Sequence, residues 1–140
     1  MHNDLIKSAE SIGLFCRLNM HTKRDLPIRS SEMGVLIFTQ KQNKPVTPLM
    51  ISQFFKIKKP TVTTMVNALV HAGYLIKVPS LSDGRSYVLE LTSTGYALLE
   101  VTFESYFKTM EALKGKMGSD AFDQLVGLID QANQVLLEDQ

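Results

Sequence analysis

A lysine-rich segment at the start of a helical pattern carries the clearest chemistry in this sequence. Lys56, Lys58 and Lys59 precede or begin an amphipathic stretch, and Pro60 favours the start of a helix there. A helix N-terminus already carries partial positive charge, so lysines at this place are unfavourable for folding alone. Together with the free backbone N–H groups, however, such lysines bind phosphate well. We therefore predict that these lysines contact a polyanion.

The helix that follows the lysines has one apolar and one polar face. Val62, Val66 and Leu69 recur at helical spacing and are expected to face inward. Short hydrogen-bonding side chains remain on the outward face, where they can read base edges in a major groove. These candidates are Thr61, Thr63, Thr64 and Asn67. For this helix taken alone, an ordinary solvated polar surface is the alternative.

A hairpin is expected directly after this helix, because the hydrophobic period changes there from about 3.6 to 2. Segments 74–78 and 86–91 read as strands, and the loop between them contains Asp83 and Arg85. An arginine at the tip of such a ribbon can enter a minor groove, where the potential is most negative over A·T-rich DNA. Asp83 can hold that guanidinium through a charge-assisted hydrogen bond. Lys77, on the first strand, is a further candidate for phosphate contact; a solvated turn is the alternative for the loop alone.

Charge is unevenly distributed along the chain, although the net charge is only +1. Residues 33–82 contain no Asp or Glu, whereas residues 91–140 contain more acids than bases. A solvated lysine face would explain the lysines of the middle segment but not its missing acids. The distribution favours a protein with one face against a polyanion.

The elements that must position these residues are mainly helical. A helix-turn-helix is expected over about 47–72, and a β-hairpin wing over about 74–91. Other helices are expected over about 3–24, 93–116 and 119–137, with a further one capped by Ser30 or Ser31. The three long helices have more apolar positions than one DNA-binding lobe of about seventy residues can bury. We therefore expect a homodimer.

Several protein classes are disfavoured by the composition. With 140 residues the chain fits a single domain, and no apolar run is long enough to span a membrane. The N-terminus lacks a secretion signal and Cys16 has no partner for a disulfide, so we expect a cytoplasmic protein. His2, His21 and His71 form no ligand cluster, so no metal is predicted. Without a catalytic or cofactor motif, we expect no enzyme activity, catalytic residue or cofactor.

An ordered set of motifs within residues 47–95 resembles the MarR family of winged-helix regulators, and the resemblance spans nearly the whole chain. The matching positions are Gly73 after the helix, Asp83 and Arg85 in the wing, and Leu91, Thr92 and Gly95 after the wing. Each piece alone is weak evidence. Their order over this length is specific.

The resemblance implies a mainly α-helical single domain over 1–140, a winged helix-turn-helix with flanking dimerisation helices at about 3–24 and 93–137. It implies a recognition helix, Pro60–Ala72, in the major groove and Arg85 in the minor groove. It further implies a transcription repressor that binds double-stranded DNA at a pseudo-palindromic operator as a homodimer. A small-molecule effector is expected between the dimerisation helices and the DNA-binding lobe.

The sequence departs from the family at two DNA-contacting places. Gly84 stands where the wing often has a second basic residue, and Thr63 and Thr64 stand where many members have arginine. Bidentate reading of guanine by arginine is therefore not available from this helix. This absence favours the alternative function, a winged-helix protein-interaction module without DNA binding. The acid-free segment and Arg85 favour DNA.

Cys16 and an aromatic group in the helix expected over about 93–116 are candidates for sensing a signal, but a structural role is favoured for both. Some relatives sense oxidants through a cysteine in the first helix, yet segment 26–33 offers no tyrosine to stabilise a thiolate. Cys16 falls in the apolar pattern, so we predict a buried structural cysteine. Phe103, Phe107 and Met110 can line an effector pocket, although aromatics at helical spacing more often belong to the core.

Overall fold

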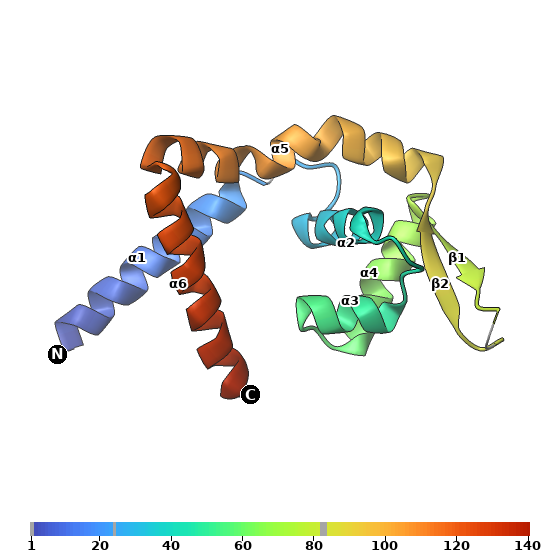
Figure 1. The fold of residues 1–140 in the computed structure, drawn as a ribbon, viewed down its shortest axis with the longest axis horizontal. Helices are drawn as coiled ribbons and strands as arrows, with labels where there is room; N and C mark the ends of the chain where they lie inside the picture. The colour runs from blue at the N-terminus through green and yellow to red at the C-terminus, as the bar shows by residue number, and fades with distance from the viewer. Residues whose placement is uncertain (1, 24, 82–83) are drawn as a thin grey trace. The chain divides into compact units, whose positions relative to one another are not determined.

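The computed structural model describes residues 2–23, 25–81 and 84–140, which form six helices and a two-stranded sheet (Figure 1). In chain order the elements are α1 (His2–His21), α2 (Ser30–Lys41), α3 (Pro48–Phe55), α4 (Lys59–His71), β1 (Leu75–Pro79), β2 (Tyr87–Leu91), α5 (Ser93–Met117) and α6 (Ser119–Glu138). The predicted mainly α-helical fold with a small hairpin is confirmed. The predicted boundaries agree with the observed ones to within three residues.

The chain divides into two compact units. The winged unit spans Lys23–Tyr106, and the helical unit combines Met1–Thr22 with Phe107–Gln140. Helix α5 therefore begins in the winged unit and ends in the helical unit. Within the described residues, no helix is both long enough and apolar enough to cross a lipid bilayer.

The winged unit has a well-buried apolar core. Val62, Val66 and Leu69 of α4 are each at most 1% exposed, as their helical spacing predicts. The other core members are Met33, Val35, Leu36, Phe38, Val46, Ile51, Leu75, Leu89, Leu98 and Leu99. Full burial of one such side chain contributes about 1.5–3 kcal/mol. This core fixes α4 in a defined rotation about its axis and so determines which of its residues face solvent.

Helix α2 starts differently from the prediction. Its N-cap is Arg29, in an extended conformation, and Ser30 is already the first helical residue. The carboxylate of Glu32 accepts a hydrogen bond from the backbone N–H of Arg29 at 3.1 Å. The predicted hydroxyl cap at Ser30 or Ser31 is wrong, because the chain enters the helix before either residue can occupy the capping position.

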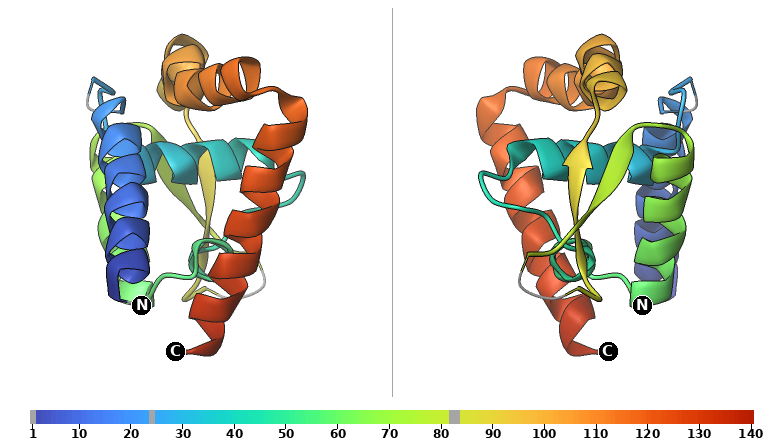
Figure 2. Two further views of the ribbon diagram at one scale, coloured as in Figure 1. Left: turned by 90° about the vertical axis from the view of Figure 1, so that its left-hand side faces the viewer. Right: turned by 90° about the vertical axis from the view of Figure 1, so that its right-hand side faces the viewer.

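The hairpin pairs β1 and β2 in antiparallel register, from Leu75 opposite Leu91 to Pro79 opposite Tyr87. The side views in Figure 2 show the two strands twisting beside the helices of the winged unit. Val46 extends the sheet by one bridge, since its carbonyl accepts a hydrogen bond of 2.7 Å from the Leu89 N–H. The hairpin is thereby tied to the chain just before α3.

The junction of α4, β1 and α5 explains the Leu-Thr-x-x-Gly motif. Gly73 has a φ of +87°, and the next N–H, of Tyr74, donates back to the Leu69 carbonyl at 2.9 Å. The Thr92 hydroxyl donates to the Gly73 carbonyl at 2.6 Å and accepts from the Gly95 N–H at 3.0 Å. A Cβ at Gly95 would collide with the Tyr74 carbonyl oxygen. The motif therefore caps α5 and lets it approach β1 closely.

Among its described residues, 2–22 and 107–140, the helical unit has no comparable core. None of the residues of α1 and α6, all of which the structure describes, is buried. The hydroxyl of Thr109 in α5 donates to that of Thr22 at 2.7 Å. Exposed apolar side chains include Leu5, Ile6, Ile12 and Leu18 in α1 and Val126, Leu128, Ile129 and Leu136 in α6. Apolar faces of this extent mark surfaces that a partner covers.

Two predictions of burial are wrong for this chain. Cys16 is exposed, and no residue of α1 is buried. Phe103 is 50% exposed, while Phe107 and Met110 are half-buried, so these three do not form a core. Helical spacing correctly indicates an apolar face, but that face is not covered within the chain.

Candidate nucleic-acid interface

The turn between α3 and α4 presents three lysines to solvent. Lys56 occupies the left-handed region, with φ 56° and ψ 46°, and its N–H donates to the Ser52 carbonyl. The Ser52 hydroxyl donates to the Ile57 carbonyl at 2.7 Å, which fixes the turn from the other side. Lys56, Lys58 and Lys59 are all exposed. The turn, which these hydrogen bonds hold, therefore places the three exposed lysines next to the start of α4.

The start of α4 is free of negative charge. Lys58 is the N-cap residue, its side chain makes no capping hydrogen bond, and the first turn contains no acid. Pro60 occupies one of the first helical positions, where its missing N–H costs nothing. The positive end of the helix dipole and the lysines therefore both contribute positive potential, which favours binding of a phosphate oxygen at this helix end.

The threonines of α4 make hydrogen bonds that the sequence did not predict. The Thr63 hydroxyl donates to the Lys59 carbonyl at 3.1 Å, and the Thr64 hydroxyl donates to the Pro60 carbonyl at 3.0 Å. Both hydroxyl protons are therefore used inside the helix. What each side chain offers outward is an acceptor oxygen and a methyl group, which suit a base amino group or the thymine methyl.

Asn67 and Lys77 form a contact between α4 and the hairpin. The Lys77 ammonium donates to Asn67 Oδ1 at 3.0 Å. The same nitrogen lies 4.8 Å from the ring centroid of Tyr87, within range of a cation–π interaction. Sequence reasoning placed Asn67 and Lys77 in the interface separately, and it missed Tyr87. Lys77 pairs with Leu89, and Tyr87 lies two residues before Leu89 on the same strand. Tyr87 is therefore a diagonal cross-strand neighbour of Lys77, and this spacing was the signal that could have identified it.

The wing carries an exposed arginine. Arg85 lies just before β2, and the N–H of Ser80 donates to the Ser86 carbonyl at 3.1 Å across the base of the loop. Asp83, predicted to orient the Arg85 guanidinium, lies outside the described residues. Every described residue predicted to contact DNA is exposed: Lys56, Lys58, Lys59, Thr61, Thr63, Thr64, Asn67, Lys77 and Arg85.

A hollow of about 490 Å³ lies between α2 and α4 within the winged unit. Thr61 and Thr64, predicted to read DNA, line its α4 side. Burial raises the pKa of Tyr106, another lining residue, above its ordinary value. The remaining lining residues are Arg29, Ser30, Ser31, Gly34, Phe55, Ile57 and Met65. The hollow was not predicted, because its walls come from separate parts of the chain.

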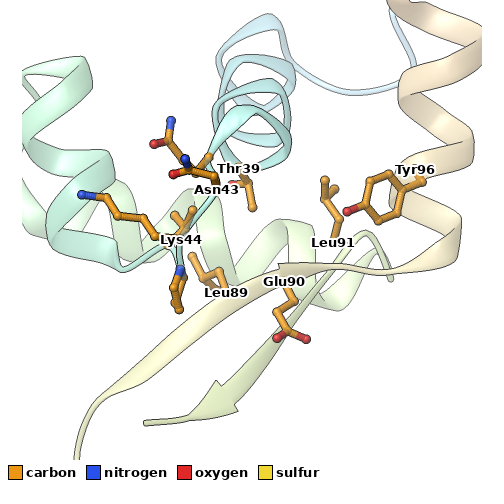
Figure 3. Close-up of a pocket in the computed structure, with 10 residues that line it drawn as sticks. Thr39, Asn43, Lys44, Leu89, Glu90, Leu91 and Tyr96 are labelled. Atoms are coloured by element: carbon orange, nitrogen blue, oxygen red, sulfur yellow. The ribbon is translucent and has the colours of Figure 1, made fainter. Parts of the chain in front are cut away.

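A second hollow, of about 440 Å³, lies where the loop after α2 meets β2 and α5 (Figure 3). Leu89, Leu91 and Tyr96 line it from the strand and the helix. Figure 3 shows the Lys44 ammonium and the Glu90 carboxylate pointing away from each other at its rim. The two charges therefore do not converge on one ligand. Among the residues that the structure describes, no three His, Cys, Asp or Glu side chains are placed to bind a metal ion.

Comparison with known proteins gives a match to a family model and similarity to proteins of low identity. Residues 36–82 match the family described as "Iron dependent repressor, N-terminal DNA binding domain". The HTH-type transcriptional regulator PecS of Dickeya dadantii is 22% identical over 138 residues, which cover 92% of this chain and 83% of PecS.

Solved structures of regulators share the fold. A MarR/EmrR family transcriptional regulator from Acinetobacter sp. ADP1 superposes with a TM-score of 0.77 at 19% identity, covering 96% of this chain and 97% of that one. The C80S mutant of MarR from E. coli, complexed with operator DNA, superposes with a TM-score of 0.76 at 17% identity, covering 94% and 97%. The resemblance found in the motifs is thus confirmed in the fold.

Proposed function

We propose that this chain, which has the fold of the MarR family, is a double-stranded DNA-binding transcription repressor. It acts as a homodimer on a pseudo-palindromic operator, and residues 1–140 work as one MarR-type domain. The observation that carries the proposal is the exposed, acid-free start of α4, with Lys56, Lys58 and Lys59 beside it. The DNA-bound MarR structure of similar fold supports the same reading.

Different parts of the winged unit have different tasks. Lys56, Lys58 and Lys59 bind phosphates and fix the register of α4 on the duplex. Thr63 and Thr64 offer acceptor oxygens and methyl groups to base edges in the major groove. Lys77, Asn67 and Thr61 complete the proposed contact surface. Arg85 enters the minor groove, with Asp83 orienting its guanidinium.

A second copy of the chain covers the apolar faces of the helical unit. Ile12 in α1 is 64% exposed, and Leu128 in α6 is 64% exposed. Soluble monomers rarely leave such faces open, and most soluble oligomers are symmetric homo-oligomers. A two-fold dimer also presents two copies of α4, which enter successive major grooves when they lie one DNA turn, about 34–36 Å, apart.

The hollow between α2 and α4 is the proposed effector site. Arg29 lines it, and the Lys23 ammonium lies 4.7 Å from the ring centroid of Tyr106. Phe55 and Met65 supply apolar walls, so the hollow suits a small organic anion with an apolar body. Because Thr61, Thr64 and Met65 belong to α4, an occupant touches the helix proposed to enter the major groove, which couples ligand binding to DNA release.

The test compares Arg85→Ala with the wild-type protein on two DNAs that differ only in the flanks of the site. The loss is expected to be about 1–3 kcal/mol with A·T-rich flanks and smaller with G·C-rich flanks, because the narrow A·T minor groove attracts arginine most. Asp83→Ala should lose less, with the same dependence on the flanks.

The control is Lys116→Ala, which removes an exposed cation from the helical unit and should leave both affinities unchanged. Equal losses for Arg85→Ala on both DNAs would make Arg85 a simple phosphate contact. A stable dimer that binds no DNA would leave a protein-interaction module as the function.

A further inference from the structure

The contact between Asn67 and Lys77 limits what this part of α4 can offer to DNA. Lysine has donors only, so the side-chain amide of Asn67 must turn its oxygen toward the ammonium. The observed bond joins Lys77 Nζ to Asn67 Oδ1 at 3.0 Å. The Asn67 NH₂ group then remains for another acceptor. Both residues are exposed, so both are accessible to a ligand that lies along α4.

Lys77 retains donor capacity after making this bond. Its ammonium carries three protons, and one of them is directed to Asn67. The half-buried ring of Tyr87 lies 4.8 Å from the same nitrogen and holds it by a cation–π interaction. The pair therefore presents two neighbouring donors, Asn67 Nδ2 and Lys77 Nζ, on one positively charged surface.

This arrangement changes the base that Asn67 can select. A free asparagine grips adenine through both amide atoms, accepting from N6 and donating to N7. Here one lone pair of Asn67 Oδ1 accepts from Lys77, and the ammonium beside that oxygen repels the positively polarised amino group of adenine. Guanine presents two acceptors, O6 and N7, to the major groove. Two adjacent donors match guanine, whereas the amino group of adenine would face the Lys77 ammonium, which is also a donor.

We propose that Asn67 and Lys77 together form a two-donor reader of one guanine in each half-site, with Tyr87 as the positioning residue. The inference rests on the proposed function, because it requires α4 to lie in a major groove. In this arrangement Asn67 of α4 and Lys77 of β1 together make the two hydrogen bonds to guanine that one arginine can make alone. Helix α4 contains no arginine, so the pair supplies a guanine-reading group that the helix itself lacks.

The experiment first selects a binding site from random DNA with the wild-type protein. Each G·C pair of the selected half-site is then replaced by A·T, and each guanine by 7-deazaguanine, which lacks the N7 acceptor. Wild-type affinity should fall about tenfold or more at one G·C pair, and also on 7-deazaguanine substitution there.

Lys77→Met should reduce the preference for guanine at this pair to less than about threefold, because it removes a donor and frees Asn67 Oδ1 for adenine. Asn67→Ala should reduce the same preference, and the double variant should lose little more than either single variant, since the two residues act as one unit. Tyr87→Phe keeps the ring and should retain the preference, whereas Tyr87→Leu should weaken it. Lys44→Met is the matched control and should change nothing at this pair.

The outcomes separate the inference from the function on which it rests. If Lys77→Met weakens binding to all sequences equally and leaves the guanine preference intact, Lys77 is a phosphate contact and the inference is wrong. Selection of a site in which Asn67→Ala changes the preference at an A·T pair would also overturn it. If the wild-type protein selects no sequence at all, the proposed function and the inference fail together.

Discussion

The winged unit and the helical unit differ in how far they bury their apolar side chains. In the winged unit, Val66 and Leu69 are buried by neighbouring elements of the same chain. In the helical unit, Ile12 and Leu128 remain exposed although they follow the same helical spacing. The difference teaches that the apolar core of the winged unit comes from one chain, whereas the helical unit leaves apolar faces open for the second copy proposed above. The following predictions test that contrast, beginning with the largest expected effect.

Two glycines of α5, one in each unit, should respond oppositely to the same substitution. Gly95→Ala places a Cβ against the Tyr74 carbonyl and 2.8 Å from the Leu91 side chain, so it should lower the free energy of unfolding by about 3 kcal/mol. Gly115→Ala meets no atom within 4 Å and should raise that free energy by about 0.5–1 kcal/mol. Urea denaturation of both variants measures the difference. Equal effects would contradict the close approach of α5 to β1.

A charge introduced on the apolar face of α6 should weaken the proposed dimer and leave the fold of the winged unit unchanged. Ile129→Asp should raise the dimer dissociation constant about thirtyfold or more, which corresponds to about 2 kcal/mol for a central interface residue. Sedimentation over a range of concentrations measures the change. Gln131→Asp adds the same charge at a polar position of α6 and should leave the dimer unchanged. A wild-type protein that is monomeric at micromolar concentration would refute the role given to this face.

Removal of one of the lysines proposed to bind phosphate should affect DNA binding alone. Lys59→Ala should weaken binding to specific and random DNA by a similar factor, because phosphates carry no sequence information. The slope of log K against log salt should flatten by about 0.9 for each phosphate that the variant no longer neutralises. Anisotropy titrations at several salt concentrations test this expectation, with Lys116→Ala as the control. A weakening confined to the selected site would instead assign Lys59 to base reading.

The smallest expected effect separates backbone strain from charge at one position. Lys56 has a positive φ of 56°, which is unfavourable for a residue with a Cβ. Lys56→Gly should relieve that strain and raise the free energy of unfolding by less than about 1 kcal/mol, while it weakens DNA binding because the positive charge is removed. Lys56→Ala removes the same charge but keeps the strain, so comparison of the two variants isolates the backbone contribution. Destabilisation by Lys56→Gly would contradict the turn geometry.

Local patterns predicted most of the winged unit. Val62, Val66 and Leu69 identified the buried face of α4, and the Thr92–Gly95 segment marked the start of α5, because caps and helical spacing act over a few residues. The bonds of Asn67 to Lys77 and of Lys77 to Tyr87 could not be predicted. They join residues of different elements, and their geometry depends on how the hairpin packs beside α4.

The sequence predicted the helices of the helical unit, but it did not predict which of their side chains are buried. Cys16 follows the apolar pattern of α1 and is nevertheless exposed. Spacing indicates that a face is apolar, but it carries no information about whether the same chain or another copy covers it. The same limit applies to Phe103 of the winged unit, which was expected in the core and is half exposed.

Selection of bound fragments from random double-stranded DNA tests the central claim most directly, because it examines the winged unit and the dimer in one measurement. The proposed function predicts enrichment of two inverted half-sites whose centres lie about 10–10.5 base pairs, or a multiple of that spacing, apart. Ile129→Asp should retain the half-site sequence but lose the fixed spacing, because the winged unit folds without the dimer. Failure of the wild-type protein to enrich any sequence, or enrichment of single sites without a symmetric partner, would contradict the account.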